Sequence, residues 1–142
     1  MPDKFGPEVR SRIMQQIKGR DTKPEQAVRS YLHGAGLRFR LHRTDLPGKP
    51  DIVLPKYRAV VFVQGCFWHQ HPGCRHSGVP LSNQAYWRPK LERTVARDKA
   101  NRRALAKLGW RVYTSWECQI ARGRLAGLVR QITQAKPRRR ES

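Results

Sequence analysis

The chain has 142 residues, enough for one domain whose hydrophobic core needs no disulfides to hold it. Its 30 Lys and Arg against 10 Asp and Glu give a formal net charge of +20, which favours a polyanionic partner such as DNA or RNA. No apolar run is long enough to cross a membrane, and no signal-peptide core follows Met1. Three cysteines, an odd number, do not suit a disulfide framework. We therefore expect a cytoplasmic, nucleoid-associated protein.

Periodicity and turn residues divide the chain into alternating helices and strands, which predicts an α/β fold. Residues 64–81 lack periodicity and are rich in Gly and Pro, which predicts an irregular loop organised by a metal. In chain order we expect helices over residues 11–19 and 22–34 and strands over 37–41, 51–54 and 57–63. A helix over 82–108 follows, which Ser82 caps and Pro89 interrupts or restarts, and then a strand over 110–115 and a helix over 125–132.

The helix at residues 22–34 begins with a sequence typical of a helix N-terminus. Thr22 precedes Glu25 by three residues, as in a capping box, and Pro24 lies in the first turn. Glu25 also shares a helix face with Val28 and Leu32, so its carboxylate could point toward the sheet instead of only capping the helix. We assign the apolar face of this helix to Ala27, Val28, Tyr31 and Leu32.

Three cysteines and one histidine have the spacing of a metal site. Cys66, His71, Cys74 and Cys118 together form the ligand set of a closed, tetrahedral structural zinc site. The spacing leaves His76 open as an alternative to His71. The other interpretation is three buried thiols that pack as small apolar groups. We favour zinc, because the set uses every cysteine of the chain and would order a loop with little apolar content.

Asp51 opens one apolar strand, and the next strand ends at Val63 and Gln64. Pairing of the two strands would bring the Asp51 carboxylate beside the Val63 carbonyl, where both could bind Mg²⁺. Such an ion activates water and stabilises charge on a phosphate. His69 has an ordinary pKa near neutrality and is a candidate general base or acid. Each residue alone has a structural explanation, but their combination favours a metal-dependent nuclease.

Two adjacent aromatic residues, Phe67 and Trp68, lie in the irregular loop. Both cannot easily face inward, so we expect at least one to be exposed. An exposed aromatic side chain on a basic protein can insert between base pairs. Packing in the core is the alternative, and the residues alone leave both interpretations open.

Four blocks of the sequence resemble the very short patch repair endonucleases, and the similarity covers about residues 11–134. The blocks are Pro-Gly-Lys-Pro-Asp at 47–51, Val-Phe-Val-Gln-Gly-Cys-Phe-Trp-His at 61–69, Leu-Gly-Trp-Arg-Val at 108–112 and Trp-Glu-Cys at 116–118, with Arg20, Asp21, Thr22 and Glu25 upstream. Those enzymes nick one DNA strand at T:G mismatches left by deamination of 5-methylcytosine. The resemblance implies a restriction-endonuclease-like fold, with a central mixed β-sheet flanked by helices, a structural zinc loop and catalytic Mg²⁺.

The resemblance also implies roles for individual residues. Asp51 and the main chain of Val63 would bind Mg²⁺, His69 would be catalytic, and Glu25 would help to organise the site. The clearest departure is at 63–64, where the best-known pattern has Thr-His. Gln64 cannot titrate as imidazole does, although it can hydrogen-bond water or a phosphate in the catalytic site. The implied zinc ligands are Cys66, His71, Cys74 and Cys118, and the implied DNA-intercalating residues are Phe67, Trp68 and Trp87.

We therefore expect residues 1–135 to form a single endonuclease domain with flexible N-terminal residues, and 136–142 to form a basic, disordered tail. The expected function is Mg²⁺-dependent nicking of one strand at T:G mismatches. The expected partners are mismatched double-stranded DNA and repair-pathway proteins, without a membrane. A nick needs one active site, which favours a monomer. The alternatives are a non-catalytic zinc-stabilised DNA-binding module and a restriction-type nuclease that cuts intact duplex.

Overall fold

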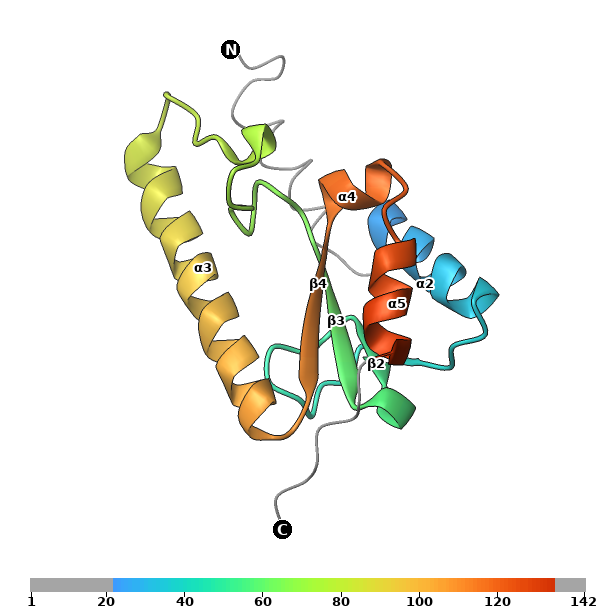
Figure 1. The fold of residues 1–142 in the computed structure, drawn as a ribbon. Helices are drawn as coiled ribbons and strands as arrows, with labels where there is room; N and C mark the ends of the chain where they lie inside the picture. Colours follow the sequence, from blue (N-terminus) through green and yellow to red (C-terminus); the bar gives the residue numbers. More distant parts are fainter. Residues whose placement is uncertain (1–21, 135–142) are drawn as a thin grey trace.

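The computed structural model describes residues 22–134, so the helix expected over 11–19 and the basic tail at 136–142 lie outside the described residues. A four-stranded mixed sheet with the strand order β1-β2-β3-β4 lies at its centre (Figure 1). The first two strand pairs are antiparallel, whereas β3 and β4 are parallel. The strands are β1 (Arg40–Leu41), β2 (Ile52–Leu54), β3 (Ala59–Gln64) and β4 (Arg111–Trp116).

Helices cover both faces of the sheet (Figure 1). The long helix α3 (Gln84–Lys107) lies on one side, and α2 (Lys23–Gly34), α4 (Glu117–Ala121) and α5 (Ala126–Gln134) lie on the other. Parallel strands require a long crossover connection, and α3 with the loop before it provides the one between β3 and β4. None of the helices within residues 22–134 combines the length and the apolar content that a membrane span requires.

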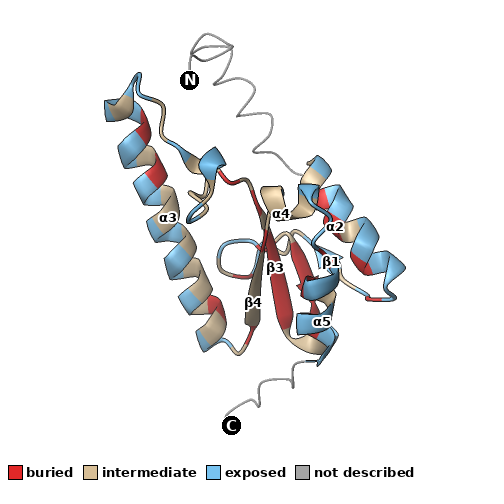
Figure 2. Cartoon of the chain, turned by 45° about the horizontal axis from the view of Figure 1, so that its top comes forward, coloured by how far each residue is buried: buried red, intermediate tan, exposed pale blue. Residues whose placement is uncertain are grey.

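Successive residues of the central strands point to opposite faces of the sheet, which produces two core layers. Ile52 and Val61 pack with Val28 and Leu32 of α2 and with apolar residues of α5. On the other face, buried side chains pack around Leu105 of α3; they are Leu46, Val53, Val60, Phe62 and Trp110. Every residue of β2 is buried, and in β3 every residue except Val63 is buried (Figure 2). The ends of this strand therefore hold rigid positions for a site.

The helix start predicted from sequence is confirmed in α2. Thr22 is the N-cap, and its hydroxyl oxygen accepts a hydrogen bond of 3.3 Å from the Glu25 main-chain N–H. The assigned apolar face is right for Val28 and Leu32 but wrong for Ala27 and Tyr31, which are exposed. Glu25 is 3 % exposed and shares the buried face of the helix with Val28 and Leu32.

Two further expectations need correction at α3. Asn83, in a left-handed conformation, occupies the N-cap position instead of Ser82, and its side chain accepts no capping hydrogen bond. Pro89 lies inside a continuous helix and does not interrupt it. The carbonyl that loses its hydrogen bond to Pro89 belongs to Ala85, which is exposed, so water can serve it. Gly109 ends the connection with a φ of 89°, as expected of a helix stop.

The remaining differences concern short elements. Only Arg40–Leu41 of the expected strand over 37–41 joins the sheet, although Leu37 is buried and Phe39 packs against the core as the alternation predicts. The pattern did not indicate α4, which has only five residues. Residues 65–83 form an irregular loop with one 3₁₀ turn, η2 (Arg75–Ser77), which confirms the irregular segment.

Candidate active site and metal centre

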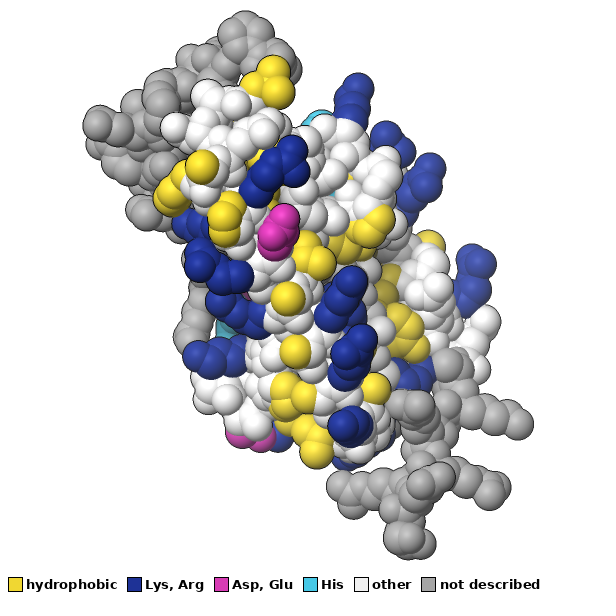
Figure 3. All heavy atoms as spheres, turned by 90° about the vertical axis from the view of Figure 1, so that its left-hand side faces the viewer, with side chains coloured by type: hydrophobic (Ala, Val, Ile, Leu, Met, Phe, Trp, Pro, Cys, Tyr) yellow, Lys and Arg dark blue, Asp and Glu magenta, His cyan; other side chains and the backbone are white. Residues whose placement is uncertain are grey.

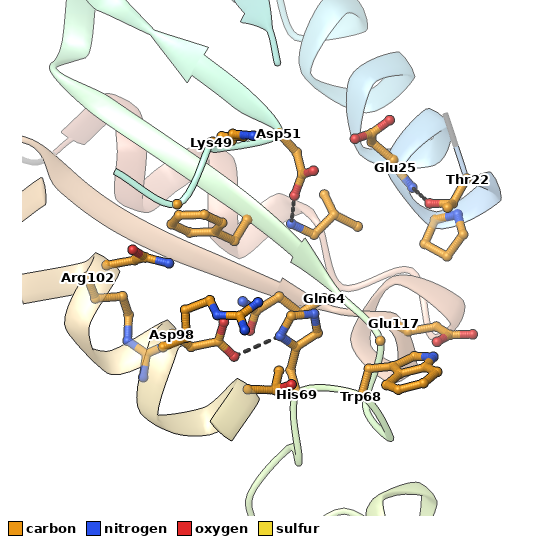
Figure 4. Close-up of a pocket in the computed structure, with 18 of the residues that line it drawn as sticks. Thr22, Glu25, Lys49, Asp51, Gln64, Trp68, His69, Asp98, Arg102 and Glu117 are labelled. Atoms are coloured by element: carbon orange, nitrogen blue, oxygen red, sulfur yellow. Dashed lines mark hydrogen bonds and ion pairs between the residues drawn. The ribbon is translucent and has the colours of Figure 1, made fainter. Parts of the chain in front are cut away.

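A cavity of about 680 Å³ opens where the end of β3 meets the N-terminus of α2 and the middle of α3 (Figure 4). The sequence-predicted residues Glu25, Asp51, Gln64 and His69 all line it, as does the main chain around Val63. These residues come from separate elements of the fold. The structure therefore brings the candidate catalytic residues into one cavity.

Asp51 is fixed at this cavity by the end of β3. Its Oδ2 accepts a hydrogen bond of 2.7 Å from the Val63 main-chain N–H. Burial raises the pKa of Asp51 from 3.8 to about 7; the Val63 N–H acts to lower this pKa and the nearby Glu25 carboxylate raises it further. Two carboxylates held this close in a partly buried cavity favour a bound proton or a cation.

Glu25 belongs to a buried cluster of charged and polar groups. Its Oε2 forms an ion pair with Arg29 and lies 3.5 Å from His42 Nε2. Arg29 Nη2 is 3.0 Å from the same His42 nitrogen. Ligand atoms of Glu25, His42 and Asp51 all lie within 4.8 Å of one another, close enough to surround a single metal ion.

His69 faces the cavity opposite the carboxylates, in contact with α3 (Figure 4). Its Nδ1 lies 2.7 Å from Asp98 Oδ2, and both side chains are partly buried. An ionised carboxylate only accepts hydrogen bonds, so it selects the tautomer with the proton on Nδ1. The His69 Nε2 then keeps its lone pair and can accept a proton.

Gln64 is 4 % exposed and lines the cavity at the end of β3. Its Oε1 is buried without a hydrogen-bond partner among the residues that the structure describes. An unsatisfied buried carbonyl is costly, so it indicates a donor that arrives from the cavity, such as water.

Sequence reasoning missed His42 and Asp98. A register signal exists for His42, because Leu41 pairs with Ile52 and the next pair outward is His42 with Asp51. A ten-residue connection separates the two strands, so the register could not be predicted from the sequence. No comparable local signal marks Asp98, which lies in a helix of charged residues.

The predicted zinc ligands converge on one point beside the cavity. Ligand atoms of Cys66, His71, Cys74 and Cys118 lie within 4.8 Å of one another, and His76 is outside this group. Cys66 Sγ and Cys118 Sγ are 3.6 Å and 3.4 Å from His71 Nδ1. Tetrahedral zinc with its usual bond lengths separates sulfur and nitrogen ligands by about 3.5 Å.

The surroundings of the metal-capable cluster hold its ligands in place. The His71 ring stacks on Trp116, with 4.2 Å between ring centroids and 9° between planes. Burial raises the pKa of the Cys66 thiol to about 12, whereas a hydrogen bond from the His76 main-chain N–H lowers that of Cys74. A divalent metal would offset the cost of the buried Cys66 thiolate.

The candidate intercalating residues form one aromatic cluster. Trp87 of α3 lies edge-to-face against Phe67 and Trp68, with ring centroids 5.4 Å and 5.9 Å away. Trp87 is 7 % exposed, and Phe67 and Trp68 are both half-buried. The loop accommodates both adjacent rings by packing them on α3, so the expectation that at least one of them would be exposed is wrong.

The sequence is similar to proteins of one known family. A family model described as DNA mismatch endonuclease Vsr matches residues 2–75. The type II nicking enzyme V.XorIIP of Xanthomonas oryzae pv. oryzae is 52% identical over 133 residues, which cover 93% of this chain and 97% of that protein. The DNA mismatch endonuclease Vsr of Escherichia coli is 43% identical over 124 residues, covering 87% and 78%. The chain therefore belongs to the DNA mismatch endonuclease Vsr family.

Proposed function

We propose that this DNA mismatch endonuclease nicks one strand at T:G mismatches by Mg²⁺-dependent hydrolysis of a phosphodiester. One observation carries the proposal: Asp51, anchored to the end of β3, faces the His69–Asp98 pair across a cavity of about 680 Å³. This arrangement provides a place for a cation, a base and room for a phosphate. Membership of the family supports the activity.

Asp51 and the main-chain carbonyl of Val63 would hold the Mg²⁺ ion. The raised pKa of Asp51 supports this, because a divalent cation relieves the repulsion between Asp51 and Glu25. The N–H and C=O of one strand residue point to the same edge, so the Val63 carbonyl faces the side on which Asp51 lies. Bound Mg²⁺ would supply Lewis-acid stabilisation of charge on the phosphate.

The side chains around the cavity have separate roles in proton transfer and in positioning. His69 accepts a proton from the attacking water at Nε2, and Asp98 positions the ring and stabilises the imidazolium that forms. Glu25 orients Asp51 from α2. Gln64 donates or accepts a hydrogen bond to the water or phosphate but takes no proton, which leaves His69 as the base.

The Cys66, His71, Cys74 and Cys118 cluster would hold a structural zinc ion. Its position pins the loop after β3 to the start of α4, and therefore fixes His69 relative to Asp51. We also propose that the mixed sheet with flanking helices is a restriction-endonuclease-like fold, and that residues 1–135 act as one domain.

Phe67, Trp68 and Trp87 would wedge into the base stack beside the mismatch. Their edge-to-face packing forms a preformed apolar cluster between the loop at residues 65–83 and α3. A mismatched pair resists unstacking less than a matched pair, which gives selectivity. The protein would act as a monomer on the nucleoid in the cytoplasm, with repair-pathway proteins as further partners.

A cleavage assay with pure protein tests the proposal. Labelled duplexes, one with a T:G mismatch and one fully paired, are incubated with protein and Mg²⁺. A single nick in the mismatched duplex alone supports the proposal. Binding without cleavage would instead indicate a non-catalytic zinc-stabilised module, and cleavage of both strands of either duplex would indicate a restriction-type nuclease.

A further inference from the structure

The acidic groups of the cavity are mostly satisfied within the protein. Glu25, Asp51 and Asp98 each have a partner, namely an arginine, a main-chain N–H and a histidine. Glu117 is exposed and lies at the other end of the cavity beside Trp68 (Figure 4). None of these contacts involves a lysine or arginine that lines the cavity.

Several cationic side chains line the same cavity. Lys49, Arg97 and Arg102 line it, together with Lys23 at the start of α2. Among residues 22–134, the side chains of Lys49, Arg97 and Arg102 form neither a hydrogen bond nor an ion pair. Positive charge that no described residue pairs with, in an open cavity, attracts anions. In a DNA endonuclease the available anion is a phosphate of the substrate.

A close contact between neighbouring residues places the turn that carries Lys49 against the part of α3 that carries Arg102. Gly48 packs so tightly on α3 that a Cβ at this position would lie 2.9 Å from the Asn101 side chain. Gly48 and Lys49 both have positive φ, of 73° and 48°, which turns the chain sharply before Asp51. Lys49 thus lies near Asp51, and Arg102 lies on the α3 side of the cavity (Figure 4).

We propose that Lys49 and Arg102 form a phosphate clamp, which binds a phosphodiester of the cleaved strand next to the scissile phosphate. The clamp rests on the proposed function, since it adds a substrate contact to the same cavity. Arg102 offers a planar fork for two phosphate oxygens, and Lys49 offers a mobile point charge from the opposite side. Within residues 22–134, neither cation has to break an ion pair to bind the strand.

Many other cations could bind DNA, so the test needs a matched control. Lys and Arg side chains also gather on the outer face of α3 (Figure 3). Arg103 is exposed, follows Arg102 directly and does not line the cavity. Variants Lys49→Gln, Arg102→Gln and Arg103→Gln therefore remove the same charge from inside and outside the clamp. Far-ultraviolet circular dichroism and the zinc content check that each variant is folded.

Binding of a fluorescent T:G duplex is measured without Mg²⁺ at several salt concentrations. Each clamp variant should lower the slope of log affinity against log salt by about 0.9, the value for one lost phosphate contact. Arg103→Gln should change the slope by clearly less. Equal slope changes for Arg102→Gln and Arg103→Gln would overturn the clamp.

A second measurement locates the phosphate. Neutral methylphosphonates replace single phosphates near the nick, and affinity is compared between the wild type and the Lys49→Gln, Arg102→Gln double variant. We expect one position at which neutralisation weakens the wild type several-fold and leaves the double variant unchanged. Equal losses at every position would refute the clamp, even if the wild type nicks normally. If the position-specific loss is observed but the wild type does not nick the duplex, the clamp is retained and the proposed function is refuted.

Discussion

Replacement of Asp51 by Asn should raise the stability of the protein in the absence of Mg²⁺, although it removes the proposed metal ligand. The carboxylate is mostly buried beside Glu25, and its pKa is raised from 3.8 to about 7. The folded chain therefore binds the proton more tightly than the unfolded chain does. Stability is lost as the pH rises from about 4 through about 7, and remains low above that range.

The size of the effect follows from the pKa values. A rise from 3.8 to about 7 corresponds to at most about 4 kcal/mol at pH 8, since each tenfold change is about 1.4 kcal/mol. Asp51 keeps some solvent contact and keeps the Val63 hydrogen bond, so we expect about half of this value. Asn retains an acceptor for Val63 without the charge. The melting temperature should then rise by about 5 °C at pH 8.

Scanning calorimetry of the zinc-loaded protein without added Mg²⁺ measures this difference. The melting temperature of Asp51→Asn should exceed that of the wild type by less at pH 5.5, because the wild-type carboxyl is mostly protonated in the folded chain at that pH. Added Mg²⁺ should stabilise only the wild type. Asp45→Asn is the matched control, because Asp45 is exposed and pairs with Arg43 on the surface. A variant no more stable than the wild type at pH 8, or an advantage independent of pH, would refute the electrostatic reasoning.

Three further substitutions test the roles of single residues. His69→Ala removes the proposed base and should lower single-turnover nicking about 10²- to 10⁴-fold with zinc still bound; an unchanged rate would discard the role. Asp98→Asn should slow nicking about 10- to 100-fold and shift the pH–rate profile, because the ring loses its charged partner; a lower rate with an unchanged profile would indicate only structural damage. Cys118→Ser should abolish zinc binding in metal analysis and cost about 3 kcal/mol or more of stability, and full zinc content would exclude this ligand.

The sequence predicted those parts of the molecule that depend on local patterns. Thr22 and Glu25 start α2 as their spacing indicates, since capping is a contact across three residues. The alternating faces of β2 and β3 follow from apolar runs in the same way. The four metal-capable residues were found because the chain has only three cysteines, and the structure brings their ligand atoms together.

The parts that could not be predicted depend on contacts between distant segments. Asp98 meets His69 across 29 residues because α3 returns along the sheet, and no local signal separates it from the charged residues around it. The pairing of His42 opposite Asp51 depends on a hairpin register that a long connection leaves open. The packing of Phe67 and Trp68 on Trp87 likewise depends on where α3 begins.

The most direct test of the account is the position of a divalent cation in crystals of the protein with a mismatched duplex. Mn²⁺ can replace Mg²⁺ and is located by its anomalous scattering. The account predicts a peak about 2.0–2.4 Å from an Asp51 oxygen and the Val63 carbonyl, with a DNA phosphate and His69 on the opposite side. A Mn²⁺ ion bound away from Asp51, or a phosphate that never enters this cavity, would contradict it.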